Sequence, residues 1–185
     1  MSFIDLHCDT ASRIFYEKEG LKKNSFSVDI EKLKKANCLG QVFAFFIDAG
    51  EVTNLESEFK SMYNTFISEI EKNKSEIEIV RNINELKSCE EKGKIGAFLS
   101  IEEGEVLKGD IKNLKRVYDM GIRFITLTWN YKNSLGYPNY NYIYKDKGLT
   151  SLGKDMVIEM ENLGIVPDCS HLSDEGFWDL IKICK

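Results

Sequence analysis

The sequence predicts an α/β fold in which parallel strands are covered by helices. Apolar, strand-like runs alternate with helical patterns along the chain, and the run 41–48 is apolar almost throughout, as expected for a strand buried on both faces. Polar residues gather where the predicted strands end. An open doubly wound sheet and a closed (β/α)₈ barrel both fit this order, and both place functional groups at the carboxyl ends of the strands. Because the chain has no glycine-rich phosphate-binding loop, an open nucleotide-binding sheet is disfavoured.

The first predicted strand, 3–10, reads FIDLHCDT. Alternate side chains of a strand share a face, so Asp5, His7 and Asp9 should point one way. The opposite face, which suits packing against helices, carries Ile4, Leu6 and Cys8. Two strand steps place the Cα atoms of His7 and Asp9 roughly 6–7 Å apart, so that both side chains can converge on one metal ion. The alternative is a strand end whose polar residues merely face the solvent.

Helical spacing and turn residues mark the elements of the first half. Ser27 and Gly40 are a plausible start and stop for a helix. The strand 41–48 follows, and then a long helix whose apolar residues recur every three or four positions from Leu55 to Ile70. The segment 76–82 fits either a short extra strand or a connector.

The second half repeats the pattern. Three strands are expected at 95–104, 123–130 and 165–171. The helices expected between and after them are 110–121, with Gly121 as its left-handed cap, 151–164, and a last helix from Asp174 that is capped by Ser173. A tyrosine-rich loop fills 131–148. The whole chain, 1–185, is expected to form a single domain.

Composition restricts the class of protein. The net charge of −5 argues against a nucleic-acid partner, which usually needs a basic face. No apolar run approaches the ~20 residues of a membrane span, and the amino terminus lacks the pattern of a secretory signal. The five cysteines are scattered and form no CxxC pair, so they are interpreted as reduced thiols. We therefore expect a cytoplasmic protein without a membrane partner that could form a homo-oligomer.

Two further strand ends carry candidates for chemistry. Glu102 ends an apolar run directly and could complete a metal site with His7 and Asp9, since a hydrolytic metal needs about three protein ligands and an open position. Its alternative is a solvated loop carboxylate, while Glu103 should face the other way or lie in the loop. His171 could bind metal or hydrogen-bond an oxygen that gains charge; otherwise it is a capping or core histidine.

The segments IDLHCDT, SIEEGE, GIRFITLTWNYKNSLG and GLTSLGKDMVIEMENLGIVPDCSHLSD resemble, in this order, the membrane dipeptidase (peptidase M19) family. The resemblance implies a (β/α)₈ TIM-barrel metallohydrolase with two zinc ions, which hydrolyses dipeptide substrates through a metal-bound hydroxide. It further implies that His7 and Asp9 are metal ligands, that Glu102 is the bridging carboxylate, and that His171 is a catalytic residue that contacts the substrate. Asn130 would lie close to the substrate.

The chain also departs from the family pattern. Its first five βα units resemble the amino-terminal portion of the barrel, and only two histidines are present. The second zinc site of the family cannot be built from them, so these residues should hold at most one Zn²⁺. The activity of the 185-residue form is therefore in doubt. A non-catalytic metal-binding segment and another barrel metallohydrolase, such as a phosphoesterase or deacetylase, are the alternatives.

Overall fold

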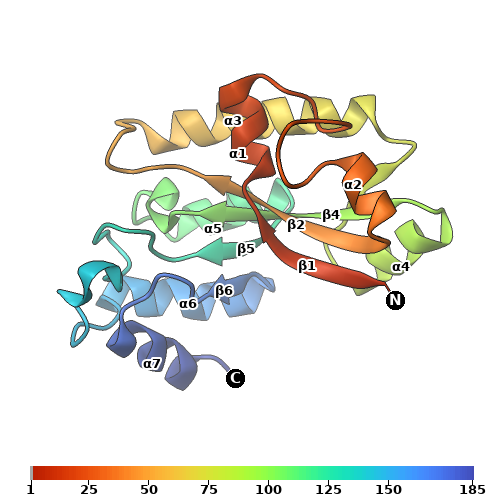
Figure 1. The fold of residues 1–185 in the computed structure, drawn as a ribbon. Helices are drawn as coiled ribbons and strands as arrows, with labels where there is room; N and C mark the ends of the chain where they lie inside the picture. Colours follow the sequence, from red (N-terminus) through yellow and green to blue (C-terminus); the bar gives the residue numbers. More distant parts are fainter. Residues whose placement is uncertain (1) are drawn as a thin grey trace. The chain divides into compact units, whose positions relative to one another are not determined.

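The computed structural model describes residues 2–185 and contains six strands joined mostly by helices (Figure 1). The strands form one sheet in the order β1-β2-β4-β5-β6, with β3 paired to β4 beside this path. Each strand pair with an assigned register, β1 with β2, β3 with β4 and β5 with β6, is parallel. The prediction of an α/β fold with parallel strands is confirmed.

The chain divides into two compact units. Residues 1–46 and 59–100 form the first, and residues 47–58 and 101–185 form the second. The first unit holds the following elements, of which α3 and β4 continue into the second: β1 (Phe3–Cys8), α1 (Thr10–Glu17), α2 (Ile30–Lys35), β2 (Cys38–Phe46), α3 (Leu55–Lys72), β3 (Ile77–Ile79), α4 (Ile83–Glu91) and β4 (Ile95–Glu102).

Aromatic side chains form the core of the first unit. Phe43 and Phe45 of β2 are buried against Phe66 of α3, with ring centroids 4.9 and 5.7 Å from it. Residues on both faces of β2 are buried, as its apolar run predicts. The apolar spacing of α3 likewise turns Phe59, Met62, Phe66 and Ile70 inward.

Several expectations for the first unit are wrong in detail. Asp9 lies outside β1, at the start of α1, a helix that the sequence analysis did not predict, as it did not predict α4. The helix expected between Ser27 and Gly40 is shorter: Asp29 caps α2 through a 2.7 Å bond from the Lys32 amide, and Gly40 belongs to β2. The segment 76–82 contains the short strand β3, the first of its two alternatives.

The apolar face of β1 is also less covered than expected. Ile4 and Leu6 keep 43% and 66% of their surface exposed, and only Cys8 is buried. The physical reason is that α1, which follows directly, packs against β2 rather than over β1. Of the three apolar residues expected on this face only Cys8 reaches the core, and the register of β1 against β2 is irregular between Phe3 and Ile4 and between Asp5 and Cys8.

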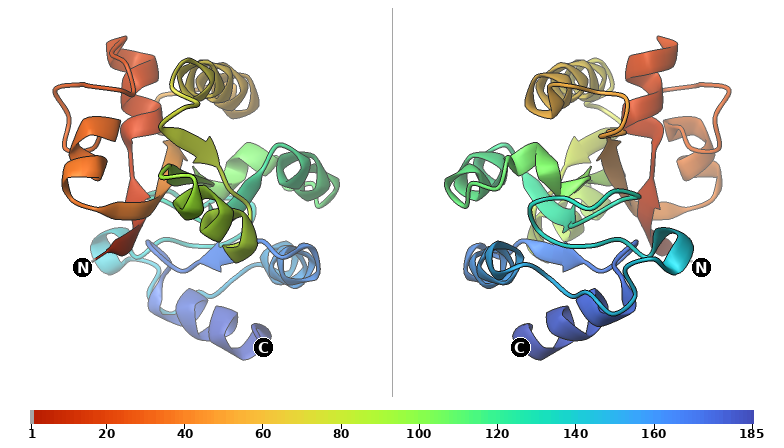
Figure 2. Two further views of the ribbon diagram at one scale, coloured as in Figure 1. Left: turned by 90° about the vertical axis from the view of Figure 1, so that its right-hand side faces the viewer. Right: turned by 90° about the vertical axis from the view of Figure 1, so that its left-hand side faces the viewer.

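The second unit begins where β4 ends. Its further elements are η1 (Gly104–Leu107), α5 (Lys112–Asp119), β5 (Ile122–Thr126), η2 (Tyr140–Tyr142), α6 (Ser151–Leu163), β6 (Val166–Asp168) and α7 (Asp174–Ile183). Figure 2 shows α6 beside β6 and α7, against which it packs.

The capping residues predicted from the sequence lie at the observed ends of the helices in this unit. Gly164 ends α6 with a left-handed φ of 77°, and Gly121 has a φ of 98° after α5. Ser173 caps α7 as expected, because its Oγ accepts a 3.1 Å hydrogen bond from the Gly176 amide. Strands β5 and β6 are shorter than the predicted runs. Within residues 2–185, every helix is too short or too polar to cross a bilayer.

Candidate active site

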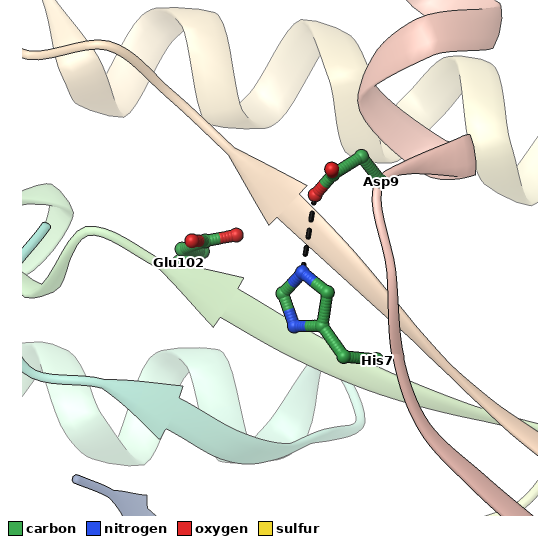
Figure 3. A group of neighbouring side chains, drawn as sticks. All are labelled: His7, Asp9 and Glu102. Carbon is green, nitrogen blue, oxygen red and sulfur yellow. Dashed lines mark hydrogen bonds and ion pairs between the residues drawn. The ribbon is translucent and has the colours of Figure 1, made fainter. Parts of the chain in front are cut away.

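His7 and Asp9 lie together at the end of β1. The Nε2 atom of His7 is 3.1 Å from Oδ1 of Asp9, and Figure 3 shows the two side chains facing each other. Asp9 occupies the N-cap position of α1, but its carboxylate makes no capping hydrogen bond there. Its φ of −85° and ψ of 10° place Asp9 itself outside the strand, and the expected approach of the two side chains is observed. An imidazole and a carboxylate at this separation are ligand types that divalent metals accept.

Glu102 is the last residue of β4 and is almost fully buried, with 5% of its surface exposed. The interpretation as a solvated loop carboxylate is therefore wrong. Its backbone carbonyl accepts a 3.3 Å hydrogen bond from the amide of Ile47, the residue that follows β2. The carboxylate pairs with the second histidine: Nε2 of His171 is 3.3 Å from its Oε1.

His171 is held by its backbone in the loop between β6 and α7. Its carbonyl accepts hydrogen bonds from the Asn139 amide, at 2.9 Å, and from Oγ1 of Thr128, at 3.4 Å. Its φ of 65° lies in the left-handed region, which few residues other than glycine adopt. The tertiary contacts around the loop maintain this conformation, which directs the imidazole toward Glu102.

Asp168 organises the same loop from the end of β6. Its Oδ2 accepts a 2.7 Å hydrogen bond from Oγ1 of the buried Thr126 in β5, and its Oδ1 accepts from the Ser170 amide at 2.9 Å. The carboxylate thus connects two neighbouring strands to the loop that carries His171. Its place three residues before His171 was visible in the sequence, but its partner Thr126 was not.

Asn130 and its neighbour Trp129 follow β5 in an irregular, half-buried segment rather than ending the strand. Trp129 packs edge-on against Tyr131, with ring centroids 6.0 Å apart. A substrate contact by Asn130 stays a prediction.

Glu103 is a residue whose burial the sequence analysis did not predict. It has no exposed surface, and burial raises the pKa of its carboxyl above the ordinary value. Its Oε1 accepts hydrogen bonds from the Glu105 amide, at 3.0 Å, and from Nδ2 of Asn133, at 2.6 Å. The sequence EEGE offered no signal that this particular carboxylate turns inward.

A model of the membrane dipeptidase family (peptidase family M19) matches residues 1–185. This chain belongs to that family. An uncharacterized dipeptidase of Schizosaccharomyces pombe is 25% identical over 174 residues, which cover 85% of this chain and 41% of the yeast protein. The chain spans about half the length of the curated relatives it matches.

Two solved structures of metallopeptidases share the fold of this chain. Dipeptidase AC is 22% identical, with a TM-score of 0.85 over 97% of this chain and 59% of that protein. A metallopeptidase of Rhodobacter sphaeroides, solved with a phosphinate mimic of the dipeptide L-Ala-D-Ala, is 20% identical, with a TM-score of 0.87 over 100% of this chain and 63% of that one. The repeated β-α order therefore corresponds to the amino-terminal portion of the (β/α)₈ barrel.

Proposed function

We propose that this chain carries part of the site of a zinc-dependent dipeptidase, with His7, Asp9 and Glu102 as metal ligands (Figure 3). The observation that carries the proposal is the 3.1 Å approach of His7 and Asp9, in which the Asp9 carboxylate faces the imidazole instead of capping its helix. Membership of a family of dipeptidases supports it.

The sheet supports including Glu102. Strand β2 lies between β1 and β4. Cys8, near the end of β1, is paired with Phe43 of β2, and the amide of Ile47, just after β2, donates to Glu102 at the end of β4. Glu102 ends its strand as His7 nearly ends β1, and parallel α/β folds carry their functional groups at the carboxyl ends of the strands.

The donor set fits zinc in its chemistry. One imidazole nitrogen and two carboxylates match the ligand types of hydrolytic zinc sites, which also keep a position open. Zinc bound there would supply the Lewis acidity that polarises a carbonyl and acidifies a water molecule. With two histidines in the chain, and His171 assigned to the substrate, these 185 residues hold at most one ion.

His171 and Asn130 are the residues we assign to the substrate. An imidazole N–H of His171 would donate a hydrogen bond to the oxygen of the scissile carbonyl as that oxygen gains negative charge. The left-handed backbone and the two hydrogen bonds to its carbonyl orient the ring before the substrate arrives. Asn130 would contact the dipeptide from the segment after β5.

Zinc content after metal loading and dialysis tests the ligand set. The 185-residue chain should retain one zinc, and His7→Ala, Asp9→Asn and Glu102→Gln should each lose most of it. Asp5→Asn is the matched control, because Asp5 is a carboxylate of the same strand outside the proposed set, and it should keep the metal. Equal zinc content in all variants would contradict the proposal.

Hydrolysis of dipeptides such as L-Ala-D-Ala by the zinc-loaded chain tests the reaction. We expect slow turnover that requires zinc and is lost in His7→Ala. A chain that binds zinc but hydrolyses no dipeptide would support a non-catalytic metal-binding segment instead. Hydrolysis of phosphoesters or N-acetyl groups in place of dipeptides would support another barrel metallohydrolase.

A further inference from the structure

A cavity of about 300 Å³ lies within the first unit, beside two of the proposed zinc ligands. Its lining contains His7 and Asp9, then Arg13 from α1, and the segment 26–28, which precedes α2. We call it the Arg13 cavity. The side chains of His7, Asp9 and Arg13 are 45%, 52% and 46% exposed, so a ligand from the solvent can reach all three. Sites for small molecules begin at about this volume, so the cavity can hold one part of a dipeptide.

The guanidinium of Arg13 is held on two sides. Its Nε donates a 2.7 Å hydrogen bond to Oε1 of Glu17, which lies one turn further along α1. Its Cζ lies 3.9 Å from the centre of the Phe26 ring, and this ring is itself buried. Stacking on an aromatic face and a charge-assisted hydrogen bond both restrict a long side chain. Arg13 therefore presents a positive charge at a defined place before any ligand binds.

The terminal nitrogens of the same guanidinium are open. Within residues 2–185 the hydrogen bonding of Arg13 ends at Nε, so Nη1 and Nη2 have no protein acceptor. Neighbouring carboxylates are engaged elsewhere: Glu17 accepts from Nε, and both oxygens of Glu19 accept from Ser25. Arginine offers its N–H groups as a planar fork that matches the two oxygens of a carboxylate. The open end of Arg13 thus fits a carboxylate that comes from outside the chain.

The position of Arg13 on α1 selects which carboxylate of a dipeptide it can reach. Arg13 follows Asp9 by four residues, which is ~6 Å along a helix axis. The hydrogen bond to Glu17 directs the guanidinium toward the next turn rather than back to Asp9. The terminal carboxyl carbon of a dipeptide is three bonds from the scissile carbonyl carbon, at most ~4.3 Å, whereas a glutamate side-chain carboxyl at the second position is five bonds away. An acidic side chain therefore spans the distance from the proposed metal ligands to Arg13 better than the terminal carboxylate.

We propose that Arg13 binds the side-chain carboxylate of a glutamate at the second position of the dipeptide. Nη1 and Nη2 each donate a hydrogen bond to one carboxylate oxygen, while Glu17 and Phe26 keep the guanidinium in place. This role of Arg13 rests on the proposed dipeptidase function and adds to it a class of substrate. Arg13 contributes to binding and takes no covalent part in the reaction.

Affinities for paired dipeptides, measured from NMR chemical shifts of the zinc-loaded chain, test the proposal. L-Ala-L-Glu should bind roughly tenfold more tightly than its neutral isostere L-Ala-L-Gln, which has the same terminal carboxylate. Arg13→Gln should bring this ratio close to one, and Arg13→Lys, which keeps the charge but loses the fork, should retain part of it. Lys18→Gln is the matched control, because Lys18 ends the same helix outside the cavity, and it should leave the ratio unchanged.

A second pair of ligands separates the two carboxylates of the substrate. L-Ala-L-Ala and its carboxy-terminal amide differ only at the terminal carboxylate, so Arg13→Gln should leave the ratio of their affinities unchanged. A lower ratio in this variant would assign Arg13 to the terminal carboxylate and overturn the proposal. Persistence of the preference for L-Ala-L-Glu in Arg13→Gln, with native-like thermal melting, would place its recognition elsewhere.

Zinc content, measured for every variant, separates this proposal from the dipeptidase function. A zinc-loaded, active chain that binds L-Ala-L-Glu and L-Ala-L-Gln equally would contradict the role of Arg13 and leave the proposed function intact. A chain that holds no zinc but still prefers L-Ala-L-Glu in an Arg13-dependent way would support the carboxylate site and contradict the zinc function.

Discussion

The Nε2 atom of His171 lies 3.3 Å from Oε1 of Glu102, although one residue follows β6 and the other ends β4. The contact joins the histidine that we assign to the substrate to the carboxylate that we assign to the metal. Glu102 is nearly buried, His171 is half-exposed, and both belong to the second unit.

Replacing His171 should separate substrate chemistry from metal binding. We expect His171→Ala to lower dipeptide turnover by about 10²–10³-fold, the effect of losing one hydrogen-bond donor to a developing oxyanion. Zinc content should stay the same, since His171 is not among the proposed ligands. Parallel measurement of turnover and zinc checks this, and a joint loss of both would make His171 a metal ligand instead.

Removing the hydroxyl of Thr126 should destabilise the fold around Asp168. Thr126→Val is similar in shape but leaves Oδ2 of the half-buried Asp168 without its 2.7 Å partner, which costs about 0.5–1.5 kcal/mol, the net contribution of a typical hydrogen bond. Thr126→Ser keeps the hydroxyl and is the matched control. Urea unfolding measures both; equal stability of the two variants would mean that the hydrogen bond contributes little.

Because of the backbone conformation of Glu103, the glycine variant at this position should be more stable than the alanine variant, the reverse of the usual order. Both Glu103→Gly and Glu103→Ala lose the carboxylate, but only glycine relaxes at a φ of 106°, so the glycine variant should be more stable by about 1 kcal/mol. At Glu105, which is outside the set of positive-φ residues, the alanine variant should be the more stable one. Denaturant midpoints of the four variants provide the comparison. Alanine above glycine at both positions would exclude strain at Glu103.

Cys8 should resist alkylation in the folded protein. Burial raises the pKa of its thiol to about 12, whereas Cys169 is exposed. Iodoacetamide at pH 8 should therefore modify Cys169 at least a hundredfold faster, with the difference abolished in urea; peptide mapping by mass spectrometry reads both sites.

The raised pKa of the Cys8 thiol also makes the stability of the fold depend on pH. Because the folded state holds the thiol proton more tightly than the unfolded state, the stabilisation is complete below the ordinary thiol pKa near 9. It is lost as the pH rises from there toward 12. Comparing the pH dependence of urea unfolding for the native chain and Cys8→Ala isolates this effect, and parallel curves above pH 9 would contradict the shift.

Local patterns in the sequence were sufficient for much of this fold. The apolar run of β2, the helical spacing of α3 and the capping residue Ser173 each act over a few neighbouring positions, so the sequence alone predicts them. The family followed from segments that occur in order along the whole chain. The candidate ligands His7 and Asp9 were visible for the same reason, since they are two residues apart at one strand end.

Other features depend on contacts between distant segments. The sequence did not show that Asp9 leaves the strand to begin α1, or that Leu6 stays exposed because α1 packs against β2. Nor did it show the pairing of Thr126 with Asp168, or the left-handed backbone of His171. Glu102 and Glu103 are adjacent and chemically identical, yet one pairs with a histidine and the other lines a cavity. Periodicity reports only which residues share a face of one element; burial, hydrogen bonding across strands and strained φ angles arise when the elements pack, and only the tertiary structure decides them.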